Sequence, residues 1–142
     1  MKKLVKARIR LDTEAINYIS IFEKLTRAHV IDCIPLENKI TFVVKEGHAG
    51  MAIGKKGVNV KLLTEKFNKK IEIIEFNKDP IKFLINLFKP IEIKNPYISE
   101  DQDGNKILNA TISKTRMLAK IKMKRAEEFI KKYYKFSEIK FN

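Results

Sequence analysis

The stretch Met51-Ala52-Ile53-Gly54-Lys55-Lys56-Gly57-Val58-Asn59-Val60-Lys61 decides how the first half of this chain folds. Its two glycines, three residues apart, let the backbone turn tightly between two helices and approach a ligand closely, because glycine has no Cβ. A helix is predicted to begin at Val58, so its free N–H groups and the positive end of its dipole would face the loop. Lys55 and Lys56 add charge there, which favours a phosphate group.

Apolar residues surround this loop. Met51, Ile53 and Val60 could form a floor on which a base lies, and Asn59 and Lys61 are expected to reach toward the strand. A backbone clamp beside an apolar floor is how single-stranded nucleic acid is held. Gly-x-x-Gly alone is common, and a simple turn between helices is the alternative. A phosphate-binding P-loop is excluded, because the spacing is one residue short and no Ser or Thr follows the lysines.

Elements are predicted outward from the loop by apolar periodicity and turn residues. Residues 4–11 alternate basic and apolar side chains, which predicts a strand or an ordered arm, with Asp12 or Thr13 capping the helix that follows. His48 is expected to cap the short helix before the loop, with a contact to RNA as the alternative. The predicted order is a helix to Thr26, strands 28–35 and 39–45, helices 48–53 and 58–68, and strand 71–76.

The second half of the chain repeats this order of elements, although its residues hardly repeat. It contains a helix over 81–88 with Pro80 at its first position, followed by strands 91–98 and 106–113 that are joined by a turn at 99–105. A helix over 114–134 and a strand over 136–141 complete it. Residues 1–76 carry 15 basic and 9 acidic side chains and residues 77–142 carry 15 and 8, which gives +6 and +7. Two basic units of similar architecture are therefore predicted.

Helix, strand, strand, helix, Gly-x-x-Gly, helix, strand is the order of a type II KH domain. Two such units resemble the archaeal NusA-like transcription factor family, and the segment from Ala52 to Lys61 matches the first KH signature of that family. The resemblance implies an α+β fold of two tandem type II KH domains, each αββααβ with a three-stranded mixed sheet and helices on one face. Residues 1–76 would be the first domain, with the Gly-x-x-Gly loop, and residues 77–142 the second, with a degenerate loop. It also implies single-stranded RNA binding in transcription termination or antitermination, with RNA polymerase as a further partner.

The second unit departs from the family pattern, because no glycine lies in its predicted helix over 114–134. A clamp of the kind described above cannot form without glycine. Basic residues crowd this helix, and they are either a solvated surface or a secondary RNA contact that acts through charge. The candidates for such a contact are Lys114, Arg116, Lys120, Lys122, Lys124 and Arg125.

Composition limits the remaining possibilities. The chain has 30 Lys and Arg against 17 Asp and Glu, a net charge of +13, which favours a polyanionic partner. Basic residues interrupt every apolar run near the N-terminus, so we expect a cytoplasmic protein with no membrane partner. Cys33, the only cysteine, is expected to be a buried structural thiol. No catalytic set of side chains is apparent, so we expect no enzyme activity, metal, cofactor or small-molecule substrate. A ribosomal or ribosome-assembly KH protein and a protein-interaction module remain as alternatives.

Overall fold

A computed structural model of the chain describes residues 2–112 and 117–142, and for residues 2–12 it describes the backbone alone. The chain divides into two compact units, Met1–Phe76 and Asn77–Asn142. The first is unit 1 and the second is unit 2.

Unit 1 is built on a mixed sheet of three strands in the order β1-β2-β3. The strands are β1 (Val30–Pro35), β2 (Lys39–Val44) and β3 (Lys70–Glu75). β1 runs antiparallel to β2, whereas β3 runs parallel to it, in a register from Lys39 opposite Lys70 to Val44 opposite Glu75. Parallel neighbours need a long crossover connection. That connection contains α2 (Ala49–Ile53), the glycine loop and α3 (Val58–Phe67).

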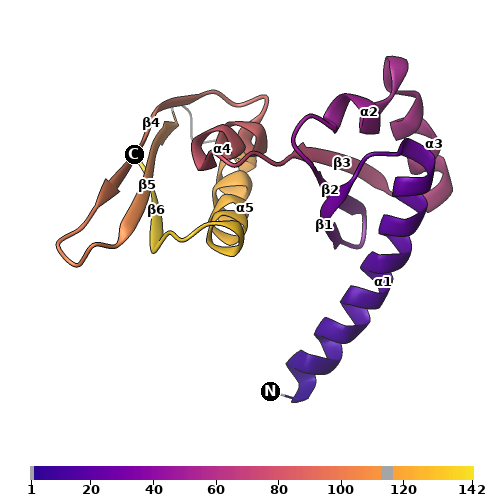
Figure 1. Cartoon of the computed structure of the whole chain (residues 1–142), viewed down its shortest axis with the longest axis horizontal. Coiled ribbons are helices and arrows are strands. Elements are labelled where there is room, and N and C mark those ends of the chain that lie inside the picture. Colours follow the sequence, from indigo (N-terminus) through magenta and orange to yellow (C-terminus); the bar gives the residue numbers. More distant parts are fainter. Residues whose placement is uncertain (1, 113–116) are drawn as a thin grey trace. The chain divides into compact units, whose positions relative to one another are not determined.

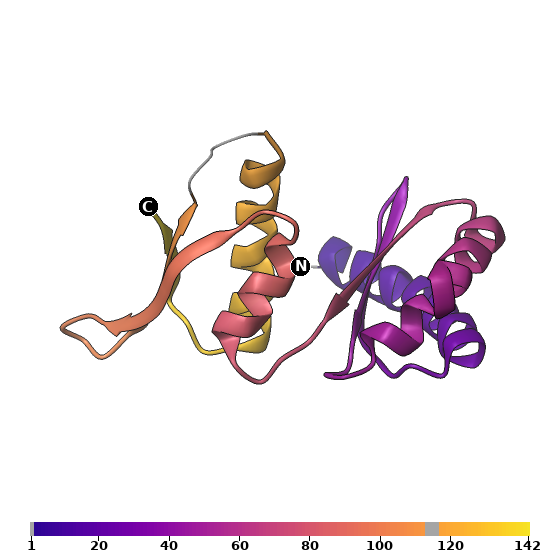
Figure 2. The same cartoon turned by 90° about the horizontal axis from the view of Figure 1, so that it is seen from above.

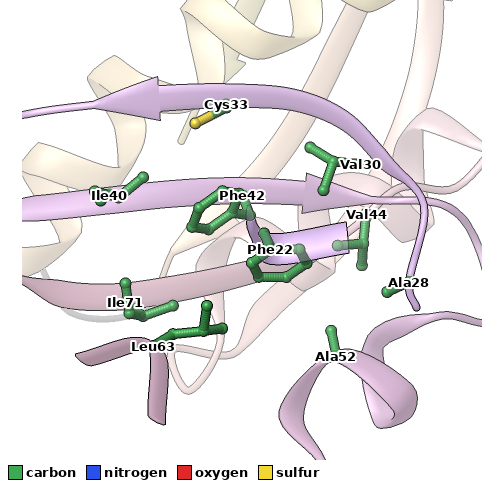
Figure 3. Close-up of a cluster of buried hydrophobic side chains, with 10 residues drawn as sticks. All are labelled: Phe22, Ala28, Val30, Cys33, Ile40, Phe42, Val44, Ala52, Leu63 and Ile71. Atoms are coloured by element: carbon green, nitrogen blue, oxygen red, sulfur yellow. The ribbon is translucent and has the colours of Figure 1, made fainter. Parts of the chain in front are cut away.

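The helices of unit 1 lie on one face of this sheet (Figures 1 and 2). Phe22 from α1 (Lys2–Thr26), Ala52 from α2 and Leu63 from α3 are fully buried in one cluster with residues of β2 (Figure 3). The rings of Phe22 and Phe42 stack with their centroids 4.1 Å apart. Each helix beside the glycine loop thus contributes a fully buried side chain to the core, which fixes both helices to the sheet.

The first helix begins earlier than the sequence suggested. The predicted strand or arm over residues 4–11, with a helix cap at Asp12 or Thr13, is wrong, because α1 is continuous from Lys2 to Thr26. Leu4, Ala7 and Leu11 continue at helical spacing toward Ala15, Tyr18 and Phe22, which pack in the core cluster or against it. No glycine or proline interrupts this pattern. The alternation over eight residues fitted both periods, and the longer helical period prevails.

Unit 2 contains α4 (Pro80–Phe88), β4 (Ile93–Glu100), β5 (Lys106–Ile112), α5 (Met117–Tyr133) and β6 (Glu138–Phe141). Its sheet is similar to that of unit 1, in the order β4-β5-β6, with β4 antiparallel and β6 parallel to the central strand. Helices α4 and α5 lie side by side on one face of it (Figure 2). Asp79 caps α4, since its carboxylate accepts the N–H of Ile81 at 2.9 Å. The rings of Phe83 and Phe129 join the helices, with centroids 6.2 Å apart.

The predicted elements are otherwise confirmed, with bounds that differ by at most three residues in the described ranges. The α+β class and the two small mixed sheets are confirmed as well. The order αββααβ describes unit 1. Unit 2 differs, because the part of it that the structure describes has one helix, α5, between β5 and β6. That single helix has 17 residues, against 10 in α3 of unit 1.

Candidate nucleic-acid interface

The loop between α2 and α3 has a backbone that glycine makes possible. Gly54 ends α2 with φ 80° and ψ 166°, a conformation open essentially to glycine alone. Lys55, Lys56 and Gly57 then form one tight turn, closed by a hydrogen bond of 3.0 Å from the N–H of Gly57 to the carbonyl of Gly54. Lys56 and Gly57 are both left-handed, with φ 56° and 74°. Two exposed lysines are thereby held at the tip of a turn between two helices.

The start of α2 is anchored by side chains from distant parts of unit 1. The carboxylate of Glu75, at the end of β3, accepts the N–H of Ala49 at 3.1 Å. His48 occupies the position before the helix, but the prediction that it caps α2 is wrong. Its backbone is already helical, and its Nδ1 accepts the N–H of His29 at 2.9 Å. The ring therefore ties α2 to the start of β1, and Nδ1 must be unprotonated to accept that bond.

Asn59 spans the loop from its far side. Its side-chain Nδ2 donates a hydrogen bond of 3.0 Å to the carbonyl oxygen of Met51 in α2. The predicted site residue thus bonds to another part of the protein at its surface, from the first turn of α3 back to α2. Gly57 occupies the cap position of α3 and has no side chain with which to cap that helix.

The segment that forms the loop and its flanking helices exposes apolar and basic side chains. Met51 and Ile53 are 46% and 42% exposed, and Lys55, Lys56 and Lys61 are exposed. No Asp or Glu occurs between Gly47 and Thr64. Sequence reasoning missed Val58 and Leu62, which are 47% and 46% exposed. Their spacing of four residues, off the face that carries Val60, Leu63 and Phe67, was the signal that could have identified them.

Val60 has a different environment from the exposed side chains of Met51 and Ile53. It is half-buried against the core and lines a shallow hollow of about 510 Å³ beside α3. Lys69 shapes one side of the hollow, because its amine donates to the carbonyl of Leu36 at 2.9 Å and lies 5.7 Å from the ring centroid of Tyr18. The hollow is lined by Asn38, Val60, Thr64, Asn68, Lys69, Lys70 and Ile71. It begins within one helical turn of the loop, since Val60 is three residues after Gly57.

The basic helix of unit 2 divides into exposed and buried residues. Lys120 and Lys124 are exposed, and Arg125 is half-buried with its guanidinium 5.8 Å from the ring centroid of Phe129. The expectation that Lys122 forms part of a surface contact is wrong. Lys122 is buried at 7% exposure, and its amine donates to the carbonyl of Leu87 at 3.2 Å. Lys114 and Arg116 lie outside the described residues.

Lys122 and Lys124 offer a matched pair on α5. The carbonyl of Leu87 lies in the last turn of α4, where helix carbonyls lack partners within their own helix, and Lys122 supplies one. Replacing Lys122 by Ala should lower the free energy of unfolding by about 2 kcal/mol, through lost packing and an unpaired carbonyl. Lys124→Ala should change it by less than about 0.5 kcal/mol. Urea unfolding followed by circular dichroism measures both, and equal effects would contradict the buried role of Lys122.

Cys33 is buried as predicted, and burial raises the pKa of its thiol to about 12, which makes it unreactive at neutral pH. Within residues 2–112 and 117–142, no three His, Cys, Asp or Glu side chains gather as they would around a metal ion. In the same part of the chain, every helix is too short or too polar to cross a bilayer.

Comparison with known proteins places this geometry in a family. Residues 16–97 match the model of the KH domain. The probable transcription termination protein NusA of Methanocaldococcus jannaschii is 37% identical over 138 residues, which cover 94% of this chain and 75% of that protein. Its namesake from Methanococcus vannielii is 52% identical over 93 residues, 66% of this chain and 54% of that protein. The match thus spans about half the length of the second relative.

A solved structure shares the fold of this chain. The crystal structure of APE1850 superposes with a TM-score of 0.72 at 30% sequence identity, over 92% of this chain and 99% of that one. The KH match contains the whole of α2, the glycine loop and α3, and the M. jannaschii relative aligns with nearly the whole chain. This chain therefore belongs to the KH-domain family of archaeal NusA-like probable transcription termination proteins.

Proposed function

We propose that this protein is a non-enzymatic factor that binds single-stranded RNA in transcription termination or antitermination. The observation that carries the proposal is the glycine loop of unit 1. It presents Lys55 and Lys56 between two helices that are fixed to the core, beside the N-terminus of α3, where a glycine occupies the cap position. Such N-termini favour anions, and KH domains use this loop to clamp a nucleic-acid backbone.

The predicted site residues other than Asn59 have three proposed roles in this clamp. Gly54 and Gly57 set the backbone, and Lys55, Lys56 and Lys61 meet phosphate groups. Exposed Met51 and Ile53, together with Val60 in the hollow beside α3, offer apolar surface to the bases. Lys69 and Lys70 at the rim of the hollow extend the positive surface beyond the loop.

We also propose that units 1 and 2 are tandem type II KH domains with unequal roles. Unit 1 has the complete αββααβ order and the glycine loop, whereas α5 of unit 2 contains no glycine. Unit 2 would then contribute through charge, with exposed Lys120 and Lys124 as its contacts. Contacts between basic side chains and the phosphates of RNA add affinity that depends on salt and not on the RNA sequence.

The relatives favour transcription over the ribosome as the place where the protein acts, because those compared are named as transcription termination proteins. RNA polymerase is the proposed protein partner, and the cytoplasm the proposed compartment. Sedimentation of cell extracts at moderate salt separates the two possibilities. We expect the protein to travel with RNA polymerase, and stable association with ribosomal subunits would contradict the proposal.

A direct binding experiment tests the RNA assignment. Fluorescence anisotropy with a labelled single-stranded RNA and with a duplex of the same length measures both affinities at one salt concentration. The clamp predicts tighter binding of the single strand, because bases must unstack to meet the apolar surface. Equal affinities would indicate that the net charge alone attracts RNA and would overturn the proposed clamp.

A further inference from the structure

We propose that Asn59 is a positioning residue, which holds α2 and α3 together across the loop and so presents Lys55 and Lys56 in one geometry. The sequence suggested instead that Asn59 reaches toward RNA. The inference rests on the proposed function for its purpose, but the structural contact that carries it involves the protein alone.

The first observation is the hydrogen bond that Asn59 makes. Its Nδ2 donates to the carbonyl of Met51 at 3.0 Å, eight residues back in the chain. Carbonyls near the C-terminus of a helix lack partners within that helix. α2 has only five residues, far too few for a helix to be stable by itself. A side chain from α3 thus pairs one of the free carbonyls of α2 and ties the end of the short helix to the longer one.

The second observation is how closely Asn59 packs against Gly54. A Cβ added at Gly54 would lie 2.8 Å from Cγ of Asn59, 2.9 Å from its Nδ2 and 3.0 Å from its backbone nitrogen. These distances are shorter than van der Waals contact. Asn59 therefore occupies the space that a side chain at residue 54 would need, and the two residues pack directly against each other.

The two glycines of the loop thus differ in their surroundings. A Cβ added at Gly57 would meet no heavy atom within 4 Å, so Gly57 is needed for its left-handed backbone alone. Gly54 is needed both for its backbone and for the contact with Asn59. A loop held in its bound conformation loses less entropy on binding, and this is how Asn59 would raise affinity without touching RNA.

The test replaces Asn59 in the full chain by Ala, which removes the donor, and by Asp, which keeps the shape but cannot donate. Amide hydrogen exchange is measured without RNA. In both variants the N–H groups of Gly54 and Gly57 should exchange faster than in the wild type, while those of β2 stay unchanged. Titration with single-stranded RNA should show about a tenfold loss of affinity for Asn59→Ala, comparable to one hydrogen bond. The dependence on salt should be unchanged in Asn59→Ala, because this substitution alters no charge and the lysines still meet phosphate.

Lys61→Ala is the contrasting variant. Lys61 is exposed on the same helix and is a proposed phosphate contact, so its loss should make the salt dependence shallower without changing hydrogen exchange. Unchanged exchange in both Asn59 variants would overturn the positioning role, and so would unchanged affinity despite faster exchange. Failure of the wild-type protein to bind RNA would refute the proposed function instead, and the exchange data would still report on the contact itself.

Discussion

Replacing both Lys55 and Lys56 by Asp is expected to weaken binding of single-stranded RNA by roughly 100-fold at moderate salt. Both side chains are exposed at the tip of the loop, in a segment without a carboxylate from Gly47 to Thr64. Each lost phosphate contact removes a charge-assisted hydrogen bond and the release of condensed counterions. The slope of log affinity against log salt should therefore become shallower by about 0.7 per contact, or about 1.4 for the pair.

The matched control changes the net charge by the same amount elsewhere. Lys78 and Lys82 are exposed near the start of unit 2, and replacing both by Asp also lowers the charge by four. This control should lose far less affinity than the loop variant. Equal losses would mean that overall charge attracts RNA, and unchanged binding in the loop variant would refute the assignment of the loop.

Gly54→Ala is expected to have the second large effect. The backbone at φ 80° and ψ 166° is unfavourable for any residue with a Cβ, and the new methyl group would lie 2.8 Å from Cγ of Asn59. Backbone strain and overpacking together should cost about 3 kcal/mol of unfolding free energy, or an equivalent rearrangement of the loop. RNA affinity should fall by at least about 100-fold, because the turn that presents the lysines cannot form. Urea unfolding and RNA titration measure the two losses.

Substitutions at two other glycines serve as controls for Gly54→Ala. Gly57→Ala meets open space and should cost only about 1–2 kcal/mol, for its left-handed backbone. Gly50 lies within α2 at an ordinary helical conformation, also with no heavy atom near an added Cβ. Gly50→Ala should therefore stabilise the protein by about 0.5–1 kcal/mol and leave RNA binding intact. The account is contradicted if Gly54→Ala is tolerated as well as Gly50→Ala.

Local sequence signals were enough to predict the loop and most of unit 1. Gly54 and Gly57 marked the break between two helices, and the run from Ile40 to Val44, rich in β-branched residues, marked the central strand. These features depend on residues close together in the chain. The start of α1 was mispredicted because eight alternating residues fit both a strand and a helix, and only the apolar spacing farther along the chain separates them.

Contacts between distant residues could not be predicted in this way. His48 is bonded to His29 and Ala49 to Glu75, at separations of 19 and 26 residues. Lys122 resembles its exposed neighbours in sequence, yet it lies in the interior and pairs with Leu87, 35 residues away. Asn59 has a polar side chain that could bind a ligand. Only its hydrogen bond to the carbonyl of Met51 reveals that it joins two helices of the protein. In each case the partner is fixed by tertiary packing, which periodicity does not encode.

The central claim is that single-stranded RNA is held at the glycine loop of unit 1. It is tested most directly by titrating the ¹⁵N-labelled full chain with a short single-stranded RNA and following backbone amide chemical shifts. The account predicts the largest changes from Gly54 to Lys61, smaller ones at Lys69 and Lys70, and little change in β1. Changes confined to α5, or spread evenly over the exposed lysines, would contradict it.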